Sequence, residues 1–500
     1  MTLFSRISGL VRDVVMANIL GPGALSDAFV VAFRIPNFLR RIFAEGAFSQ
    51  AFVPVFAELT EQNTAQAKQF VNTSASILAL VTLILCVFGI IFAPDIVALL
   101  APGFQQEPEK FAITVESLRL MFPYLFCISL VAMSAGVLNT LNRFAVPAVT
   151  PVLLNLCLIT AMLVLTPLLD HAAQALAVGV LIAGFLQLFF QVPSLIKEGY
   201  FPKFNLDFKN SAVRRVSMLM LPSIFSVSVV QINLFVSMIL ASRLETGSVS
   251  WLYYSDRLME FPVGVFGIAL ATVVLPSLSK KHAAGSSESF SAMMDWALRW
   301  VVMISVPAAV GLYLLAMPLI TTIFQHGAFS ERDVLMSTVA LEAIAIGVSG
   351  FIFIKVLAPG FFAKQDTKTP VKIAVIAVAV NILLSIVLVE RMAHVGLALA
   401  VSISAWVNAF LLLLILRLRK TYKPQSGWLW YLFRIAVAVC LMGACLMWLN
   451  ESPEVWFEKN LWQRVMSLST IILSAVATYF SSLFVLGVRP NQLLLSPRHN

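Results

Sequence analysis

Charged and chemically reactive side chains are scarce in this sequence. Asp, Glu, Lys and Arg make up only 12% of its 500 residues, whereas an ordinary soluble domain has about 25%. The five cysteines and five histidines form no CxxC pair, HExxH motif or other metal-ligand spacing. No Walker loop and no set of nucleophile, base and orienting residue is visible either. These absences argue against a soluble enzyme and a secreted disulfide-bonded protein, and we expect no catalytic residue, cofactor or metal site.

Apolar residues, by contrast, make up 60% of the chain, whereas soluble proteins contain about 45–50%. Because one membrane-spanning helix needs about 20 apolar residues, the chain has room for about 12 to 15 of them. Hydropathy predicts an all-α integral membrane protein with about 14 transmembrane helices. The predicted spans run near residues 3–20, 25–57, 70–99, 112–138, 145–168, 172–196, 212–242, 250–279, 289–325, 335–362, 370–389, 395–416, 427–449 and 461–487.

The distribution of basic residues between loops predicts the orientation of these spans. Loops after even-numbered spans, together with the C-terminal tail, carry about 18 Lys and Arg residues, and loops after odd-numbered spans carry about five. Since short cytoplasmic loops are enriched in Lys and Arg, we expect both termini to lie in the cytoplasm. The same enrichment accounts for the net charge of +9, because no basic run has the interleaved aromatic residues of a nucleic-acid interface. We therefore expect no nucleic-acid partner.

Two halves of the chain resemble each other weakly. Ser26-Asp27 is followed by two prolines within the second predicted span, and Ser255-Asp256 is followed by two within the eighth. Repeated bundles with Pro- or Gly-interrupted helices are typical of transporters whose substrate site lies between the halves. We therefore predict two pseudo-symmetric six-helix lobes plus two extra C-terminal helices. The boundaries are an N-terminal lobe at 1–205, a C-terminal lobe at 206–425, and the extra helices with a cytoplasmic tail at 426–500.

Several ionisable residues lie within the predicted spans, where each costs about 2.5–3.5 kcal/mol at a helix centre. A charge at that depth is expected to face a partner or a water-filled cavity. The N-terminal half is rich in arginine, whose planar guanidinium suits bidentate binding of pyrophosphate. We therefore expect a cavity for a polyanionic headgroup. The residues concerned are Arg6, Arg12 and Asp13 in the first span, Asp27, Arg34, Arg40 and Arg41 in the second, Asp256, Arg257 and Glu260 in the eighth, and Lys355 in the tenth.

Simpler explanations remain open for part of this set. The arginines of the second span could extend to a membrane interface instead of lining a cavity. The acidic and basic residues of the eighth span could neutralise one another as a structural pair. Arg6 and Arg12 are harder to explain in this way, because both lie within one short span.

Four longer stretches of the sequence are distinctive. They are Phe4-Ser-Arg-Ile-Ser-Gly-Leu-Val-Arg-Asp13, Pro36-Asn-Phe-Leu-Arg-Arg-Ile-Phe-Ala-Glu-Gly-Ala-Phe-Ser-Gln50, Gly247-Ser-Val-Ser-Trp-Leu-Tyr-Tyr-Ser-Asp-Arg-Leu-Met-Glu-Phe-Pro262 and Lys355-Val-Leu-Ala-Pro-Gly-Phe361. These stretches resemble the MurJ/MviN family, the bacterial lipid II flippases, and the resemblance extends over essentially the whole chain. Family members commonly have additional residues before the Phe-Ser-Arg segment, so the family pattern predicts a longer N-terminus than this sequence has.

The resemblance implies a member of the multidrug/oligosaccharidyl-lipid/polysaccharide exporter superfamily. Its implied activity is to move lipid II, an undecaprenyl-pyrophosphate-linked muropeptide, from the cytoplasmic to the periplasmic leaflet by alternating access. The last two spans would then form a groove for the polyprenyl tail. The family's cavity residues correspond here to Arg6, Arg12, Asp27, Arg40, Ser250, Asp256, Arg257, Glu260 and Lys355.

The resemblance also implies a bacterial inner-membrane protein, and we expect a monomer whose partners are lipid II, membrane lipids and a coupling ion. Because there is no Walker loop, the membrane potential or an ion gradient would supply the energy. Three other functions stay open. The first is a drug/cation antiporter of the same fold, which would favour a cavity dominated by carboxylates. The others are a flippase for another polyprenyl-linked oligosaccharide and a membrane enzyme acting on polyprenyl phosphates.

Overall fold

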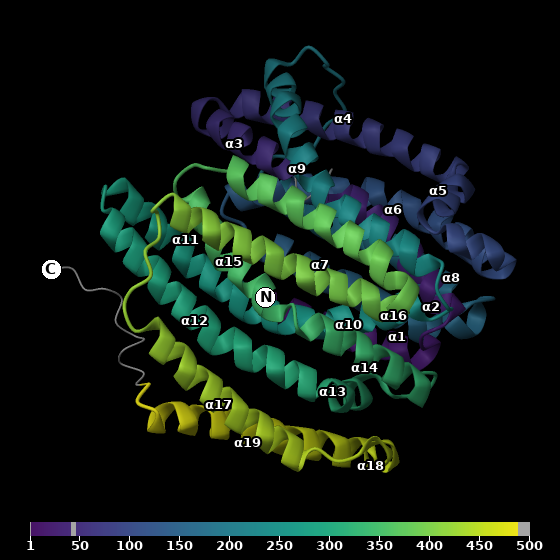
Figure 1. The fold of residues 1–500 in the computed structure, drawn as a ribbon. Coiled ribbons are helices and arrows are strands. Elements are labelled where there is room, and N and C mark those ends of the chain that lie inside the picture. The colour runs from purple at the N-terminus through teal and green to yellow at the C-terminus, as the bar shows by residue number, and fades with distance from the viewer. Residues whose placement is uncertain (1, 42–46, 489–500) are drawn as a thin grey trace. The chain divides into compact units, whose positions relative to one another are not determined.

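The fold is known from a computed structural model, which describes residues 2–41 and 47–488. Within these residues every regular element is a helix (Figure 1). Ten of the described helical segments are long and apolar enough to cross a membrane. The prediction of an all-α membrane protein is therefore confirmed. Residues 42–46 of the second predicted span and the predicted tail from residue 489 onward lie outside the described residues.

The chain divides into two compact units. Unit 1 comprises Met1–Ser250 and His326–Phe329. Its helices are α1 (Thr2–Leu20), α2 (Ala24–Arg40), α3 (Ala47–Gln62), α4 (Thr64–Ile91), α5 (Ala93–Leu100), η2 (Pro102–Gln106), α6 (Pro108–Thr140), α7 (Ala145–Val164), η3 (Thr166–Leu168), α8 (Ala172–Lys197), α9 (Ser211–Ser242) and the start of α10 (Ser248–Pro262).

Helix α6 organises unit 1, because it packs against α2, α4 and α8. Glycines allow these helices to approach closely. A methyl group at Gly89 of α4 would lie 2.1 Å from the ring of Phe122 on α6, and one at Gly184 of α8 would lie 2.8 Å from the ring of Tyr124. Small residues at helix contacts are a common means of association in membranes, where the hydrophobic effect between helices is lost.

Unit 2 comprises Trp251–Gln325 and Ser330–Asn500. Its helices are the remainder of α10, the π-helical turn η4 (Val263–Gly267), α11 (Ile268–Ala283), α12 (Ser287–Leu314), α13 (Ala316–Phe324), α14 (Glu331–Ala345), α15 (Val348–Phe362), α16 (Lys368–Leu418), α17 (Trp428–Leu449), α18 (Pro453–Glu458) and α19 (Leu461–Val485). Helix α15 packs against α11, α12 and α16 and is the counterpart of α6 in this unit.

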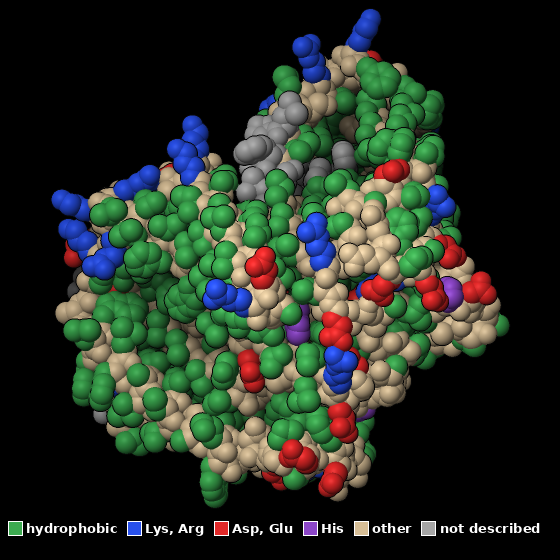
Figure 2. Space-filling model, turned by 45° about the vertical axis from the view of Figure 1, so that its right-hand side comes forward, with side chains coloured by type: hydrophobic (Ala, Val, Ile, Leu, Met, Phe, Trp, Pro, Cys, Tyr) green, Lys and Arg blue, Asp and Glu red, His purple; other side chains and the backbone are tan. Residues whose placement is uncertain are grey.

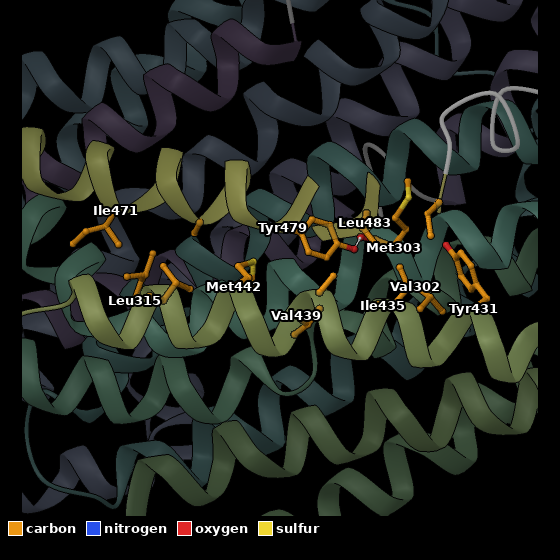
Figure 3. Packing of buried hydrophobic residues seen from close by; sticks show 14 of the residues in the cluster. Val302, Met303, Leu315, Tyr431, Ile435, Val439, Met442, Ile471, Tyr479 and Leu483 are labelled. Carbon is orange, nitrogen blue, oxygen red and sulfur yellow. Dashed lines mark hydrogen bonds between the residues drawn. The ribbon is translucent and has the colours of Figure 1, made fainter. Parts of the chain in front are cut away.

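The last two long helices of unit 2 form a pair. Helices α17 and α19 lie side by side and are joined by α18 (Figure 1). Aliphatic and aromatic side chains fill the space between this pair and α12, and the Tyr479 hydroxyl donates to the Met303 carbonyl at 2.7 Å (Figure 3). At the other end of the pair, the buried Arg464 guanidinium donates to the carbonyls of Thr321 and Gln325, which end α13. Helices α12 and α13 therefore hold the pair in place within unit 2.

The predicted spans coincide with the observed helices, although some predicted spans cover two successive helices. The eighth span is divided into α10 and α11 by the π-helical turn that follows Pro262, as expected where proline removes a helical hydrogen bond. The eleventh and twelfth spans are two helices that together carry the label α16, and a sharp kink at Ala393, where φ is 48° and ψ is −132°, separates them. The prediction of two separate spans therefore agrees with the structure.

Hydrophobic side chains cover much of the face drawn in Figure 2, with charged groups confined to a few places. On α4, for example, Leu83, Ile84 and Phe88 are each about half exposed. Apolar surface of this extent is unfavourable in water but not against lipid tails. The exposed apolar faces are therefore consistent with helices that lie in a bilayer.

Candidate functional site

Arg12 is buried in α1, and its neighbour in the chain neutralises its charge. Its Nη2 and Nε donate to Asp13 Oδ1 at 2.6 and 3.0 Å. Its Nη1 donates to Asn155 Oδ1 of α7 at 3.2 Å, and the Asn155 amide donates to Ser8 Oγ at 2.9 Å. A buried guanidinium is tolerated only when it is paired and hydrogen-bonded. These contacts therefore show how an apolar helix can hold an arginine in a fixed orientation.

The other two arginines predicted for the cavity in unit 1 are less enclosed. Arg6 lies on α1, about 9 Å along the helix axis from Arg12, and is half-buried. Arg40 is half-buried in the last turn of α2, where its Nε donates to Asn37 Oδ1 at 3.1 Å. Both residues are partly accessible, which an arginine needs if it is to meet a ligand.

Asp27, in the first turn of α2, is the centre of a buried polar network. Its Oδ1 accepts hydrogen bonds from the Ser250 hydroxyl at 2.5 Å and the Ser250 backbone N–H at 2.9 Å. Its Oδ2 accepts from the Gly247 N–H at 2.8 Å and lies 3.2 Å from Lys110 Nζ. The carboxylate therefore has two backbone donors, a hydroxyl and a cation around it, and two of the predicted site residues, Asp27 and Ser250, are in direct contact.

Lys110 completes this network, and the sequence analysis missed it. Its side chain is only 2% exposed. Its Nζ donates to Thr246 Oγ1 at 3.0 Å, lies 3.5 Å from Glu107 Oε1, and stands 4.2 Å from the centre of the Phe104 ring. The hydropathy of the region placed Lys110 in a loop before a span, whereas the structure places it in the first turn of α6. The signal that could have drawn attention to it is that no cation stands three or four residues from Asp27 in its own span.

In unit 2, the predicted site residues of α10 form a local ion pair. Arg257 Nη1 donates to Glu260 Oε2 at 3.1 Å, and Nη2 donates to the Tyr253 hydroxyl at 3.2 Å. The guanidinium also lies over the Tyr253 ring, 5.0 Å from its centre. The Arg257 side chain is 31% exposed and that of Glu260 is 61% exposed, so an anion could displace the glutamate without dehydrating a closed site. Asp256, directly before Arg257, is half-buried.

Lys355 occupies the middle of α15, next to the π-helical turn. A methyl group at Gly267 would lie 3.3 Å from the Lys355 Cγ, so the absence of a side chain there leaves room for the aliphatic part of the lysine. The residue is exposed. The π-helical turn, which ends at Gly267, therefore lies directly against the cation of α15.

A second polar cluster lies where α15 meets α16, outside the membrane-spanning segments. The Asp366 carboxylate accepts hydrogen bonds from the Thr369 hydroxyl at 2.6 Å and the Thr369 N–H at 3.0 Å, and from Arg419 Nη1 at 2.6 Å. These bonds, those of Thr369 first, lower the pKa of Asp366 to about 2. Asp366 is therefore ionised at neutral pH and connects the start of α16 to its end.

The structure thus distributes the nine predicted site residues over both units. Unit 1 contains the five residues Arg6, Arg12, Asp27, Arg40 and Ser250, and unit 2 contains the four residues Asp256, Arg257, Glu260 and Lys355. Among the described residues, no group of three or more His, Cys, Asp or Glu side chains could hold a metal ion.

Comparison with known proteins shows the family to which this chain belongs. The family profile described as "Lipid II flippase MurJ" matches residues 16–467. The chain belongs to this family. A relative from Vibrio cholerae, named "Probable lipid II flippase MurJ", is 42% identical and covers 99% of this chain and 95% of its own length. A relative from Burkholderia cenocepacia, named "Lipid II flippase MurJ", is 41% identical, with 98% of this chain and 96% of the relative covered.

Solved structures agree with this family membership. A structure titled "Lipid II flippase MurJ, inward closed conformation" matches with a TM-score of 0.82 and 28% identity, over 97% of each chain. An inward-facing MATE family multidrug transporter matches with a TM-score of 0.68 over 83% of this chain and 94% of its own, at 16% identity. The second likeness shows a shared fold and nothing about the substrate. The protein is a multi-pass membrane protein of the MurJ family.

Proposed function

We propose that this protein is a lipid II flippase, which moves the lipid-linked peptidoglycan precursor from the cytoplasmic to the periplasmic leaflet of the bacterial inner membrane by alternating access. The observation that carries the proposal is the similarity to named lipid II flippases over 98–99% of the chain. Lipid II has an anionic pyrophosphate, a polar sugar-peptide headgroup and a long apolar tail. A protein that moves it must stabilise the anion within the membrane, which agrees with arginines placed in apolar helices.

The proposed substrate-binding residues are those that the family resemblance implies: Arg6, Arg12, Asp27, Arg40, Ser250, Asp256, Arg257, Glu260 and Lys355. Their contacts suggest different roles. Arg257 is partly exposed and its partner Glu260 is close to solvent, so Arg257 is the more direct ligand for pyrophosphate. Arg12 is already committed to Asp13 and Asn155, so its guanidinium is held in one orientation and is a less direct ligand. Asp27 and Ser250 are engaged with each other and act together.

The proposed organisation keeps the N-terminal lobe at 1–205, the C-terminal lobe at 206–425 and the C-terminal region at 426–500. The paired helices α17 and α19 lie in that last region and expose many apolar side chains, among them Leu429, Trp462 and Leu473. Such a surface suits a polyprenyl tail. The proposal includes a monomer with both termini in the cytoplasm, driven by the membrane potential or a coupling ion. It involves no covalent chemistry, because flipping transfers the substrate without breaking a bond.

The test is complementation in a bacterium depleted of its own lipid II flippase. We expect this chain to restore lipid II exposure at the periplasmic face, measured by a probe that reacts only with lipid II on that side. Arg257→Ala is expected to abolish exposure at normal protein levels in the membrane. Arg143→Ala is the matched control, since Arg143 forms an exposed ion pair with Glu198 and such pairs contribute little.

An inserted wild-type chain that leaves lipid II in the cytoplasmic leaflet would contradict the proposed function. Full lipid II exposure with Arg257→Ala would contradict only the assignment of Arg257 to the binding site. Binding of purified protein to lipid II, compared with a cationic dye, separates the flippase from a drug/cation antiporter of the same fold.

A further inference from the structure

A cavity at one end of unit 2 has no role in the proposed transport. It has a volume of about 250 Å³ and lies between the α11–α12 connection, the end of α15 and the end of α16. Cationic side chains reach it from two of these elements, Lys364 after α15 and Arg419 and Lys420 after α16, and His282 lines it from α11. Among the residues that the structure describes, no Asp or Glu lines this cavity. It is therefore a space in which positive charge is concentrated.

Neighbouring groups hold two of the three cations at this cavity, Lys364 and Arg419, in place. Lys364 Nζ donates to the Thr421 hydroxyl at 3.1 Å and lies 5.6 Å from the centre of the Phe290 ring. Arg419 Nη1 donates to Asp366 at 2.6 Å, and Nη2 donates to the Thr369 hydroxyl at 3.0 Å. Side chains fixed in this way lose less conformational entropy when a ligand binds. The cavity is thus pre-organised for an anion.

The local charge balance favours an anionic ligand. Asp366 lines a second cavity, of about 310 Å³, which shares Lys364, Arg419 and Thr421 with the first. The linings of the two cavities together carry this one carboxylate and three cations, Lys364, Arg419 and Lys420. The excess positive charge would attract an anion into the first cavity. Its volume exceeds the needs of a halide ion, and Lys and Arg together suit the oxygens of a phosphate group.

The surroundings of the cavity connect it with the membrane surface. Leu418, directly before Arg419, is 70% exposed, and Phe362, two residues before Lys364, is 40% exposed. Apolar side chains beside cations are typical of the interfacial region, where acyl chains meet headgroups. We propose that this cavity binds a phosphate group, supplied either by the headgroup of an anionic phospholipid or by a free phosphate, at a site separate from the substrate residues.

The experiment uses the full-length protein in a neutral detergent. One probe is short-chain phosphatidylglycerol, a second is inorganic phosphate, and short-chain phosphatidylcholine is the zwitterionic comparison. The Lys364→Gln/Lys420→Gln variant removes two charges that line the cavity. The matched control, Lys368→Gln/Lys372→Gln, removes two charges from the start of α16, and neither lysine lines the cavity. Thermal unfolding of each variant shows that the fold is retained.

We expect saturable binding of a phosphate probe by the wild type, weakened about tenfold or more in Lys364→Gln/Lys420→Gln, because charge-assisted hydrogen bonds are lost. The control variant should change the affinity less than twofold. Binding of phosphatidylglycerol alone identifies a lipid headgroup, and binding of inorganic phosphate identifies a soluble ligand. Equal weakening in both variants, or no saturable binding of either anionic probe, would overturn the proposal. Neither probe carries a muropeptide, so that outcome would leave the flippase proposal untouched.

Discussion

The Asp27 carboxylate and the Lys110 ammonium illustrate how a charge is held inside this membrane protein. Their side chains are 1% and 2% exposed, and their charged atoms are 3.2 Å apart. Removing two ions from water costs several kcal/mol for each, and the mutual attraction compensates only when the remaining hydrogen bonds are also satisfied. Ser250, Gly247 and Thr246 supply these bonds. The pair is therefore stable as a unit, and each ion depends on the other.

This dependence predicts a non-additive effect on stability. Lys110→Met leaves the Asp27 carboxylate buried without its cation, and we expect it to lower the free energy of unfolding by about 3–5 kcal/mol. Asp27→Asn should be destabilising for the same reason. The double variant Asp27→Asn/Lys110→Met should be more stable than Lys110→Met alone, since no uncompensated charge remains. Thermal unfolding of the four proteins in detergent measures the coupling, and additive losses would show that the two ions act independently.

At the level of elements, Asp366 joins the outer ends of the two helices that make up α16. It accepts hydrogen bonds from Thr369 in the first turn of α16 and from Arg419 directly after its last turn. The sharp kink at Ala393 between the two helices allows these ends to meet on one side of unit 2. A single carboxylate therefore connects the two helices, and its protonation should open this connection.

The lowered pKa of Asp366 fixes the pH range of that effect. Its pKa is about 2 in the folded protein, against an ordinary value of 3.8, because the Thr369 hydrogen bonds favour the charged form. The resulting stabilisation is fully present above pH 3.8 and is lost as the pH falls through about 2. We expect Asp366→Asn to lower stability by about 0.5–2 kcal/mol at pH 7, as for the loss of a helix cap.

Thermal unfolding in detergent between pH 7 and pH 3 measures this difference. The gap between wild type and Asp366→Asn should narrow below about pH 4, where only the wild type loses the carboxylate interactions. Thr369→Val serves as the companion variant. It removes the hydroxyl that contributes most to the pKa shift, so it should weaken the dependence on pH without removing the carboxylate. A gap that stays constant to pH 3 would show that Asp366 does not contribute through its charge.

For the molecule as a whole, the helices could be predicted from the sequence because the lipid bilayer determines both their length and their apolar character. A segment that crosses a bilayer must satisfy its backbone internally and expose apolar side chains to lipid. Such segments are readable without tertiary information. The sharp kink at Ala393 within α16 and the π-helical turn after Pro262 depend instead on packing against neighbouring helices, which hydropathy does not record.

The candidate site could be predicted only in part for a related reason. A scan for charges within apolar segments finds Arg12, Asp27 and Arg257, because such charges are costly and rare. It does not find Asn155, which is a neutral amide yet orients Arg12. It also misplaces Lys110, which lies in a predicted loop and is buried through contacts with Asp27 and Thr246, far from it in the sequence. Partners in a polar network are recognised by three-dimensional contact and not by composition.

The orientation of the whole molecule follows from loop charges and can be tested directly. In a variant whose five native cysteines are replaced by alanine, single cysteines are introduced at Lys209 and Lys280, in basic loops, and at Asp170 and Glu454, in loops with few basic residues. All four positions are exposed. A membrane-impermeant thiol reagent added to intact cells should label Asp170→Cys and Glu454→Cys, while Lys209→Cys and Lys280→Cys should react only after the membrane is permeabilised.

This result is expected because translocating Lys and Arg against the membrane potential is unfavourable, so basic loops remain in the cytoplasm. Asp170 lies between α7 and α8, whereas Lys209 lies between α8 and α9, so one helix, α8, separates the two positions. Glu454 and Lys280 extend the same comparison to unit 2. Labelling of all four positions from outside would contradict a membrane-spanning α8, and an inverted pattern would place both termini in the periplasm.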